Sequence, residues 1–378
     1  MVFSIKDSEY RQCSVSLMDN VANPDITFDE NGISNYFYEY KTKLSAQLNS
    51  EEKQLQIKKI VETLKRNGRG KPYDCMVGLS GGVDSSYLCY LAWKLGLRVL
   101  CVHFDNGWNS ELAVDNVHKI VEKCCFDLYT YVINWNEFRD IQIAYFKAGV
   151  IDLEAPTDIG IFNSLTLICI QKNIKYILIG DNLASEGVGV AAWSNKNPNN
   201  LIDIHQKFGS KPLKEFPIII KNGRYIYYKN VYSKIRLLDL FDYNVKLAKQ
   251  TIIDEFNWRD YGGKHYESIF TRFYQGYILP EKFQVDKRKM HLSSLIFSGQ
   301  ISKEEASLEM KNPIYPEELL HVDKDYVIKK LGMTSSDFEE YMESPVFDHG
   351  YYYNEPPTGV QVSLIRRVLS RFKQLVIN

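Results

Sequence analysis

Short apolar runs alternate with segments of helical periodicity between about residues 71 and 240. The apolar runs read YDCMVGL, RVLCVHF, LYTYVI and YILIGD, and helical patterns start at Ser85 and cover about 111–124 and 159–172. Apolar runs of this length, joined by helical crossovers, are typical of parallel strands. We therefore predict an α/β fold here, a Rossmann-like parallel sheet with helices on both faces, with ligands bound at the carboxyl ends of the strands.

The regions on either side of residues 71–240 follow other patterns. Residues 1–50 are irregular, with turn residues in NPD and DENG, and we interpret them as a small N-terminal module. The polar stretch KLSAQLNSEEKQLQIKKIVETLKRNG predicts a helix that continues through a linker at 51–70. Residues 241–345 form a mainly helical region, and 346–378 a tail with a predicted helix, VQVSLIRRVLSRFKQL. Its basic residues could meet an acidic partner, although a solvated face is the simpler interpretation: Arg366, Arg367, Arg371 and Lys373.

The clearest helical pattern after residue 240 runs from Gly263 to Leu279. One face of this predicted helix is apolar and carries Tyr266, Ile269, Phe270, Phe273 and Tyr277. A second, polar face adjoins it and carries His265, Ser268, Arg272 and Gln275.

Composition narrows the classes of function. Lys and Arg total 46 against 47 for Asp and Glu, so the net charge gives no support for nonspecific binding to nucleic acid or an anionic membrane. No apolar stretch is long enough for a signal peptide or a membrane span, and we expect a cytoplasmic protein without membrane insertion. Seven cysteines, five of them in predicted strands or core helices, indicate reduced, buried thiols rather than disulfides.

The residues SGGVDSS (80–86) stand at the turn between the first predicted strand and its helix. Gly81 and Gly82 let the backbone approach an anion, and the first N–H groups of the helix point the same way. Hydroxyl donors are added by Ser80, Ser85 and Ser86. A phosphate-sized anion is the natural ligand, although the same residues could simply cap the helix and form a tight turn.

The string Ser-Gly-Gly-Val-Asp-Ser lacks the Gly-Lys-Ser/Thr of a Walker motif. It resembles the pyrophosphate loop (PP-loop) of the N-type ATP pyrophosphatases, which include GMP synthetase, asparagine synthetase and tRNA-thiolating enzymes. The resemblance implies that ATP binds with Mg²⁺, and that the turn contacts ATP through Ser80, Gly81, Gly82, Val83, Asp84, Ser85 and Ser86.

Residues beyond the later strands are expected to complete the site. The resemblance assigns the adenosine to Phe104, Asp105 and Asn106 after the second strand. Further contacts with ATP are expected after the YILIGD strand, at Gly180, Asp181, Asn182 and Glu186, and Asp158 is expected to face the substrate. Mg²⁺ could be held by Asp84 together with Asp181. For each of these residues taken alone, a turn or capping role is an equally good interpretation.

Other segments narrow the resemblance to one family. FDENGISNY, FDNGWNSELAVDN, WRDYGGKHYESIFTRFYQGYILPEKF and DKRKMHLSSLIFSGQISKEEA resemble the N-acetyl sugar amidotransferases of surface-polysaccharide and nonulosonic acid pathways, over about residues 10–345. This resemblance implies a sugar-binding set, Lys264, His265, Glu267 and Arg272, whose alternative is a salt-bridged surface face. It also implies that the catalytic step depends on Ser80, Asp84, Ser85, Lys264 and Arg272.

The implied reaction replaces an amide oxygen with nitrogen. The acetamido oxygen attacks the α-phosphate of ATP and releases pyrophosphate, and ammonia then displaces AMP to leave an acetamidino group. Such a reaction needs positioning and charge stabilisation but no covalent nucleophile, so Cys124 and Cys125 are interpreted as structural. No segment resembles a glutaminase. The family therefore implies a separate glutaminase subunit, similar to that of imidazole glycerol phosphate synthase, and a cyclase-like subunit that conducts ammonia.

One feature departs from the family, whose members usually open with two Cys-x-x-Cys pairs. This chain keeps Cys13 but has Ser16, Ser34 and Phe37 at the other positions. One thiolate cannot form a four-thiolate zinc site, so we expect no zinc and a turn held by ordinary packing. Two other functions stay open: a tRNA-modifying enzyme with the same loop, and a nucleotide-binding protein without turnover.

Overall fold

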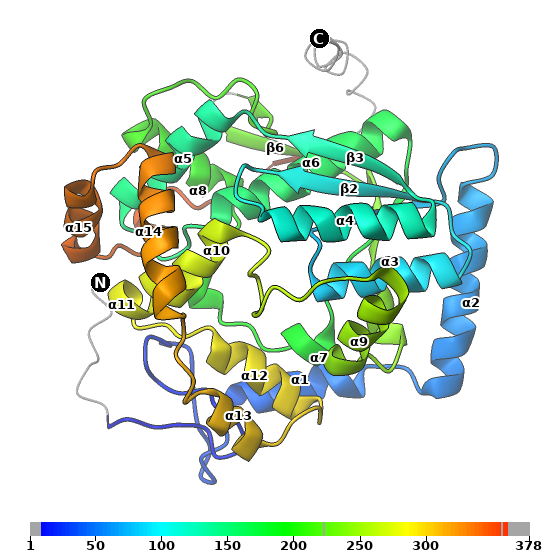
Figure 1. Ribbon diagram of the computed structural model, residues 1–378, viewed down its shortest axis with the longest axis horizontal. Helices are drawn as coiled ribbons and strands as arrows, with labels where there is room; N and C mark the ends of the chain where they lie inside the picture. The colour runs from blue at the N-terminus through cyan, green and yellow to red at the C-terminus, as the bar shows by residue number, and fades with distance from the viewer. Residues whose placement is uncertain (1–8, 222–223, 357, 362–378) are drawn as a thin grey trace.

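A five-stranded parallel sheet forms the centre of the computed structural model, which describes residues 9–221, 224–356 and 358–361 (Figure 1). The strand order is β3-β2-β1-β4-β7, and every neighbouring pair is parallel. The strands are β1 (Cys75–Gly78), β2 (Val99–Asp105), β3 (Asp127–Val132), β4 (Tyr176–Leu178) and β7 (Ser233–Ile235). The chain turns toward β2 after β1 and returns to β4 on the other side, so a crevice forms beyond the carboxyl ends of β1 and β4.

Helices cover both faces of the sheet, as predicted. Alternate residues of β1 point to opposite faces: Cys75 and Val77 pack into one core and Met76 into another. The first core includes residues of α2 (Ser50–Asn67), α3 (Val83–Lys94), α4 (Glu111–Cys124) and α9 (Val245–Phe256). The second includes residues of α6 (Ala155–Lys172). Both faces of β1 are therefore buried, which explains its continuous apolar sequence.

Helix α5 (Trp135–Ala148) was not predicted, because buried polar side chains interrupt its apolar pattern. The buried Glu137 carboxylate accepts hydrogen bonds from the backbone N–H groups of Lys214, Glu215 and Phe216. Asp140 likewise accepts from the N–H groups of residues 210 and 211. These carboxylates tie a distant loop to the helix, and α5 packs against α8 (Pro198–Phe208).

The remaining short elements lie beside the main sheet. A three-stranded sheet has the order β5-β6-β8, with β5–β6 antiparallel and β6–β8 parallel. The bounds of these elements are β5 (Ile220–Lys221), β6 (Arg224–Lys229), β8 (Thr358–Gln361), α7 (Leu183–Glu186), η1 (Ala191–Trp193), η2 (Leu237–Leu240) and η4 (His349–Tyr351).

The helix predicted from Gly263 is wrong over its first six residues, which form a loop. The helix begins at Ile269, because the Ser268 hydroxyl caps it by accepting a hydrogen bond from the Thr271 N–H at 3.2 Å. It continues as α10 (Ile269–Phe273), a π-helical turn η3 (Tyr274–Ile278) and α11 (Leu279–Phe283). Phe270 and Phe273 are buried as predicted. His265 and Ser268 do not share a helical face with Arg272.

Four more helices follow in the part of the C-terminal half that the structure describes. They are α12 (Arg288–Phe297), α13 (Lys303–Glu309), α14 (Glu317–Leu331) and α15 (Ser335–Glu343). Helix α12 packs against α7, and α14 packs against α10. The helix predicted at residues 360–375 lies almost wholly outside the described residues.

The N-terminal region ends in α1 (Asn35–Ser45), and the helix predicted through residues 43–68 is broken before α2. The break has a local cause: Asn49 caps α2 in a reciprocal capping box with Glu52. Upstream, the Ser34 N–H donates to the Cys13 Sγ at 3.3 Å, and both residues are fully buried. Hydrogen bonds and packing therefore join the positions where the family usually has cysteines.

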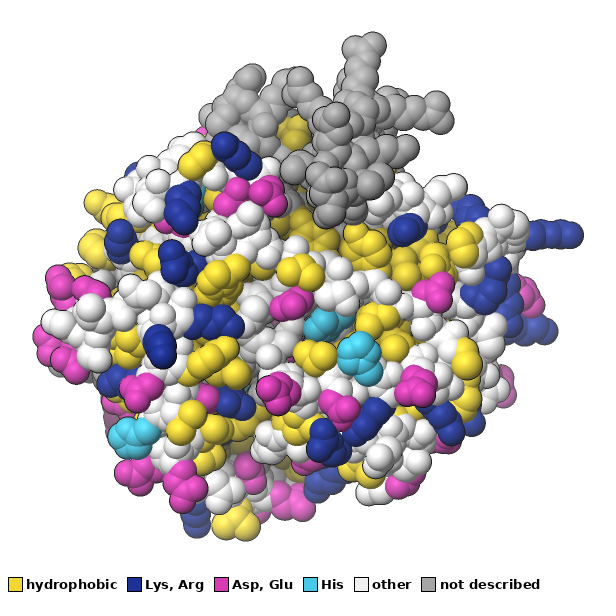
Figure 2. Space-filling view, turned by 45° about the horizontal axis from the view of Figure 1, so that its top comes forward, with side chains coloured by type: hydrophobic (Ala, Val, Ile, Leu, Met, Phe, Trp, Pro, Cys, Tyr) yellow, Lys and Arg dark blue, Asp and Glu magenta, His cyan; other side chains and the backbone are white. Residues whose placement is uncertain are grey.

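Three whole-molecule features bear on the sequence predictions. All seven cysteines are free thiols, and six of them are buried, as predicted; the exposed one is Cys125. None of the helices in the described ranges combines the length and apolar character needed to cross a bilayer. On the face seen in Figure 2, positive and negative side chains are intermixed, and neither sign gathers into a continuous patch.

Candidate active site

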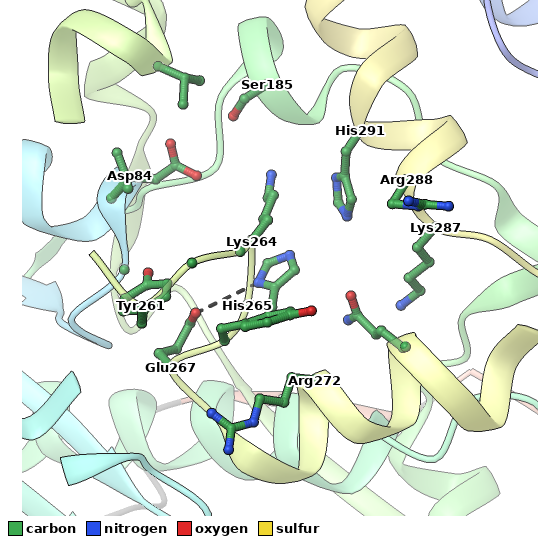
Figure 3. A pocket seen from close by; sticks show the side chains of 18 of the residues that line it. Asp84, Ser185, Tyr261, Lys264, His265, Glu267, Arg272, Lys287, Arg288 and His291 are labelled. Atoms are coloured by element: carbon green, nitrogen blue, oxygen red, sulfur yellow. Dashed lines mark ion pairs between the residues drawn. The ribbon is translucent and has the colours of Figure 1, made fainter. Parts of the chain in front are cut away.

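A pocket of about 840 Å³ lies beyond the carboxyl ends of β1 and β4 (Figure 3). Five parts of the chain line it: the turn after β1, residues 180–186 after β4, the start of α9, the loop at 260–267, and residues from 272 onward, including α12. The pocket thus occupies the crevice where the strand order reverses, the usual ligand position in open α/β sheets.

The glycine turn after β1 is held from within. The Gly82 N–H donates to the Ser80 Oγ, and the Ser85 Oγ donates to the Gly82 carbonyl, both at 3.2 Å. Gly81 has a φ of +86°, and a Cβ on it would lie 2.6 Å from the Ala113 carbonyl oxygen. Only glycine fits that position without displacing the backbone of α4.

Helix α3 begins at Val83 with Gly82 as its N-cap, and no side chain caps it. The capping part of the alternative interpretation is therefore wrong, whereas the tight turn that it also proposed is confirmed. Because a helix start leaves unpaired N–H groups with the positive end of the dipole, the first turn of α3 is a suitable place for a phosphate.

Asp84, in the first turn of α3, and Lys264, in the 260–267 loop, both line the pocket. The Tyr243 hydroxyl donates to the Asp84 carboxylate, and burial raises the pKa of Asp84 despite the nearby positive charge of Lys264. The Lys264 Nζ lies 3.1 Å from Glu186. Burial alone would lower the pKa of Lys264, but the Glu186 and Asp84 carboxylates outweigh burial and raise it. Lys264 therefore carries a positive charge at neutral pH.

The pocket has one carboxylate at the glycine turn and another after β4. Together they could hold a magnesium ion that is also coordinated by phosphate oxygens. Asp84 and Asp181 both line the pocket. In the described part of the chain, no three His, Cys, Asp or Glu side chains form a metal-binding group. Mg²⁺ bound with a nucleotide commonly takes only one or two protein carboxylates and several phosphate or water oxygens. The donor set is compatible with that arrangement.

The loop at 260–267 brings a histidine and a carboxylate to the glycine turn. The His265 Nδ1 lies 3.7 Å from the Glu267 Oε1, and His265 has a left-handed φ of +65°. Burial would raise the pKa of Glu267, but His265 and Lys264 together hold it below its usual range. The loop is anchored by the Ser110 N–H, which donates to the Glu267 carbonyl at 2.8 Å. A non-glycine residue held in this conformation is typical of functional sites.

Arg272 lines the pocket, but its guanidinium is already paired. Its Nε and Nη2 donate to the two Asp323 oxygens at 2.6 and 2.7 Å, and the Tyr315 hydroxyl donates to the same carboxylate. Figure 3 shows the Arg272 side chain directed away from Lys264 and His291. Its predicted contact with the sugar stays a prediction, beside an evident role in packing α10 against α14.

The structure brings most of the predicted site residues to one pocket. Those that line it are Ser80, Gly82, Val83, Asp84, Ser85, Gly180, Asp181, Glu186, Lys264, His265, Glu267 and Arg272. The other predicted residues do not line it: Gly81, Ser86, Phe104, Asp105, Asn106, Asp158 and Asn182.

Several of the residues outside the pocket have structural contacts. Ser86 and Asn182 are fully buried, and Asn182 caps α7. Asp105 accepts from the Gly107 N–H at 2.8 Å, which is the turn role given above as the alternative. Phe104 stacks on Tyr131. For these residues, and for Asp158 with its ion pair to Lys196 at 2.9 Å, contact with a ligand stays a prediction.

Several pocket residues were not predicted from the sequence. They are Ser185, Lys249, Tyr261, Lys287, Arg288 and His291. The last three belong to DKRKMHLSS, a segment that carries the family resemblance. Their spacing, which places all three at the start of one helix, could have indicated that they share a site. Arg288 is paired with Asp286 at 2.9 Å, whereas Lys287 has no ion pair among the described residues.

Comparison with known proteins gives one family match. Residues 267–367 match the family described as "LPS biosynthesis protein WbpG-like, C-terminal domain". The match includes Glu267, Arg272 and α12 but not the glycine turn. No curated protein matches the chain. Among solved structures, NMN synthetase from Francisella tularensis is similar at 17% identity and a TM-score of 0.29, over 43% of this chain and 71% of that one.

Proposed function

We propose that this chain is a PP-loop enzyme that uses ATP in lipopolysaccharide biosynthesis. The single observation that carries the proposal is one shared pocket. The uncapped helix start at Ser80–Ser85 opens into the same cavity as the 264–267 loop and α12. The biosynthetic role is supported by the family match, which begins at Glu267 and includes the α12 side of that pocket.

The specific reaction that we propose is amidation of an N-acetyl sugar. The acetamido oxygen displaces pyrophosphate from the α-phosphate of ATP, and ammonia then displaces AMP to form an acetamidino group. This assignment rests on the sequence resemblance to N-acetyl sugar amidotransferases. The pocket supports it chemically, because it offers an anion site at the turn and further cations for a sugar nucleotide or a carboxylate.

Each part of the pocket has a task in this reaction. The N–H groups at the start of α3, with the Ser80 and Ser85 hydroxyls, bind the pyrophosphate portion of ATP. Lys264, charged and held by Glu186, stabilises negative charge that develops on the phosphates. Asp84 and Asp181 would hold Mg²⁺, which neutralises further phosphate charge when it is bound.

Ammonia is supplied from outside this chain in our proposal. We propose a separate glutaminase and a cyclase-like subunit that passes ammonia to the pocket, as the family resemblance implies. The pure chain should then use ammonium salts but not glutamine. Full activity from glutamine without a partner would contradict this part of the proposal.

The first test is release of AMP and pyrophosphate from ATP and ammonium chloride. The acceptors are a panel of UDP-linked 2-acetamido sugars, free acetamido nonulosonic acids and bulk tRNA. We expect AMP release to require an acetamido sugar and to yield an amidine product detectable as a mass decrease of about 1 Da, since oxygen is replaced by NH. Dependence on tRNA would favour the tRNA-modifying alternative, and no turnover with any acceptor would favour a nucleotide-binding protein.

A further inference from the structure

His291 is a partly buried residue that differs from the three fully buried histidines in its lack of hydrogen-bond partners. His103, His205 and His349 each have a polar partner within 2.9 Å. Both ring nitrogens of His291 are shielded from solvent, yet neither has a partner among the described residues. Because buried polar atoms in folded proteins are almost always paired, an unpaired imidazole on a pocket wall indicates a group that is completed by a ligand.

Neighbouring polar side chains on α12 do have hydrogen-bond partners. The Ser293 Oγ accepts from the Leu17 N–H at 3.1 Å, and the Ser294 Oγ accepts from the Val188 N–H at 3.0 Å. Both of these serines are fully buried. His291 is thus set apart by its position, since it lines the pocket while the serines pack against neighbouring segments.

The surroundings of His291 keep its imidazole neutral. Its ring centroid lies 5.4 Å from that of His265, and in Figure 3 the ring is directed toward Lys264 and His265, across the pocket from Asp84. Burial, and then the nearby Lys264, His265 and Lys287 side chains, hold the pKa of His291 well below its usual range. A neutral imidazole has one N–H donor and one free lone pair.

The neutral His291 imidazole, with positively charged lysines nearby, is suited to bind neutral ammonia. At the His291 ring, Lys264, which is paired with Glu186, and Lys287 both disfavour an ammonium ion, which cannot attack. The imidazole lone pair can accept a hydrogen bond from neutral NH₃. His265 faces the Glu267 carboxylate and so already has a partner within the protein. Of the two pocket histidines, His291 is the one whose lone pair is available.

We infer that His291 is a catalytic residue that accepts a proton from ammonia during the amination step. This inference rests on the proposed function. Ammonia adds to the carbon of the N-protonated O-adenylyl imidate, and the C=N π pair moves onto the sugar nitrogen. His291 takes one proton from the resulting ammonium group. The C–O bond then breaks, AMP leaves with the bonding pair, and the sugar nitrogen lone pair reforms a C=N bond. The products are an amidinium ion, AMP and an imidazolium that releases its proton to solvent.

The test separates adenylation from amination. Sugar-dependent exchange of labelled pyrophosphate into ATP, without ammonia, reports adenylation, and amidine formation with ammonium chloride reports both steps. The acceptor is the acetamido sugar with the highest wild-type rate. For His291→Gln we expect exchange within about twofold of wild type and amidine formation reduced about 100-fold, the size of a lost general base.

Two controls keep the test decisive. His321→Gln alters an exposed histidine on α14 and should leave both rates unchanged. His291→Ala should regain part of its amination rate with added imidazole, which a folding defect would not permit. Equal losses of exchange and amination, or no loss of either, would overturn the inference. Absence of sugar-dependent exchange in the wild type would instead overturn the proposed function and remove the basis of the inference.

Discussion

At the scale of single residues, Asp84 combines burial with function at some cost to stability. Its carboxylate lies beside the glycine turn and its pKa is raised, mainly by burial. A carboxylate whose folded pKa exceeds its unfolded pKa destabilises the fold increasingly as pH rises between those two values, because the folded state retains the proton longer. We therefore expect that replacing Asp84 removes activity but increases stability.

Asp84→Asn should abolish ATP turnover while raising Tm at pH 7.5. We expect a rise of about 2 °C, the shift that roughly 1 kcal/mol gives in a large domain. Since the benefit comes from removing a partly buried charge, it should shrink as pH falls and vanish below the unfolded pKa. Thermal unfolding at pH 7.5, 5.5 and 4 checks this. A larger benefit at pH 4 than at pH 7.5 would show that the sign is wrong.

Arg272 is either a structural partner of Asp323 or a sugar-binding residue. Variants of Arg272 and of Asp323 can distinguish these two roles. The pair is partly buried, with side-chain exposures of 15% and 3%. Arg272→Ala should lower the free energy of unfolding by about 3 kcal/mol, because it leaves a buried carboxylate without its cation. Urea unfolding measures this loss.

The predicted sugar contact of Arg272 gives a separate kinetic expectation. Arg272→Ala should raise the KM for sugar far more than the KM for ATP. Asp323→Asn keeps the guanidinium and should change the sugar KM much less. If Arg272→Ala changes both KM values equally, its role is structural and the predicted contact with the sugar is wrong.

At the scale of elements, the junction between β1 and α3 depends on Gly81. Its φ of +86° is left-handed, and the atoms nearest to an added Cβ are backbone atoms of Ala113 in α4. The turn and α4 therefore pack too closely for any side chain at this position.

Gly81→Ala should lower the free energy of unfolding by about 3 kcal/mol, from backbone strain together with the steric clash. Gly70→Ala is the matched control: its φ is +75°, but an added Cβ would have no atom within 4 Å. We expect that control to cost about 1 kcal/mol from strain alone. Denaturant unfolding of both variants compares them, and equal losses would show that contact with α4 is unimportant.

Element boundaries show where sequence patterns fail. Helix α4 was predicted with the bounds that it has, because its apolar face is regular. The helix predicted from Gly263 actually begins at Ile269. Its true start depends on Ser268, whose loop is bonded to residues 108 and 110 after β2. Contacts with a distant loop do not leave a periodic signal near residue 263.

At the scale of the whole molecule, the N-terminal region packs against α12, which lines the pocket, and against α13. Leu17 donates its N–H to Ser293 on α12, Asp19 pairs with Lys289, and Lys303 donates to the Cys13 carbonyl at 2.9 Å. The N-terminal region therefore supports α12, the helix that presents His291.

We expect this support to be independent of zinc. Metal analysis of the purified protein should find far less than one zinc per chain, and a chelator such as EDTA should leave the thermal unfolding midpoint unchanged. Hydrogen bonds among residues 13–34 and their contacts with α12 and α13 provide the stability that a metal would otherwise supply. One zinc per chain, or a large loss of stability with EDTA, would contradict this expectation.

The amino-acid sequence alone predicts the parallel sheet, the glycine turn at residues 80–86 and most of the segments that line the pocket. Each of these features follows from residues close together in the sequence, either as a hydrophobic periodicity of 2 or 3.6 residues or as a short motif. Which polar side chains find a hydrogen-bond partner depends instead on how distant segments pack. Arg272 meets a carboxylate 51 positions away, whereas His291 meets none in the described chain. Partners of this kind come together only when distant segments pack, so no local pattern could distinguish the paired arginine from the unpaired histidine.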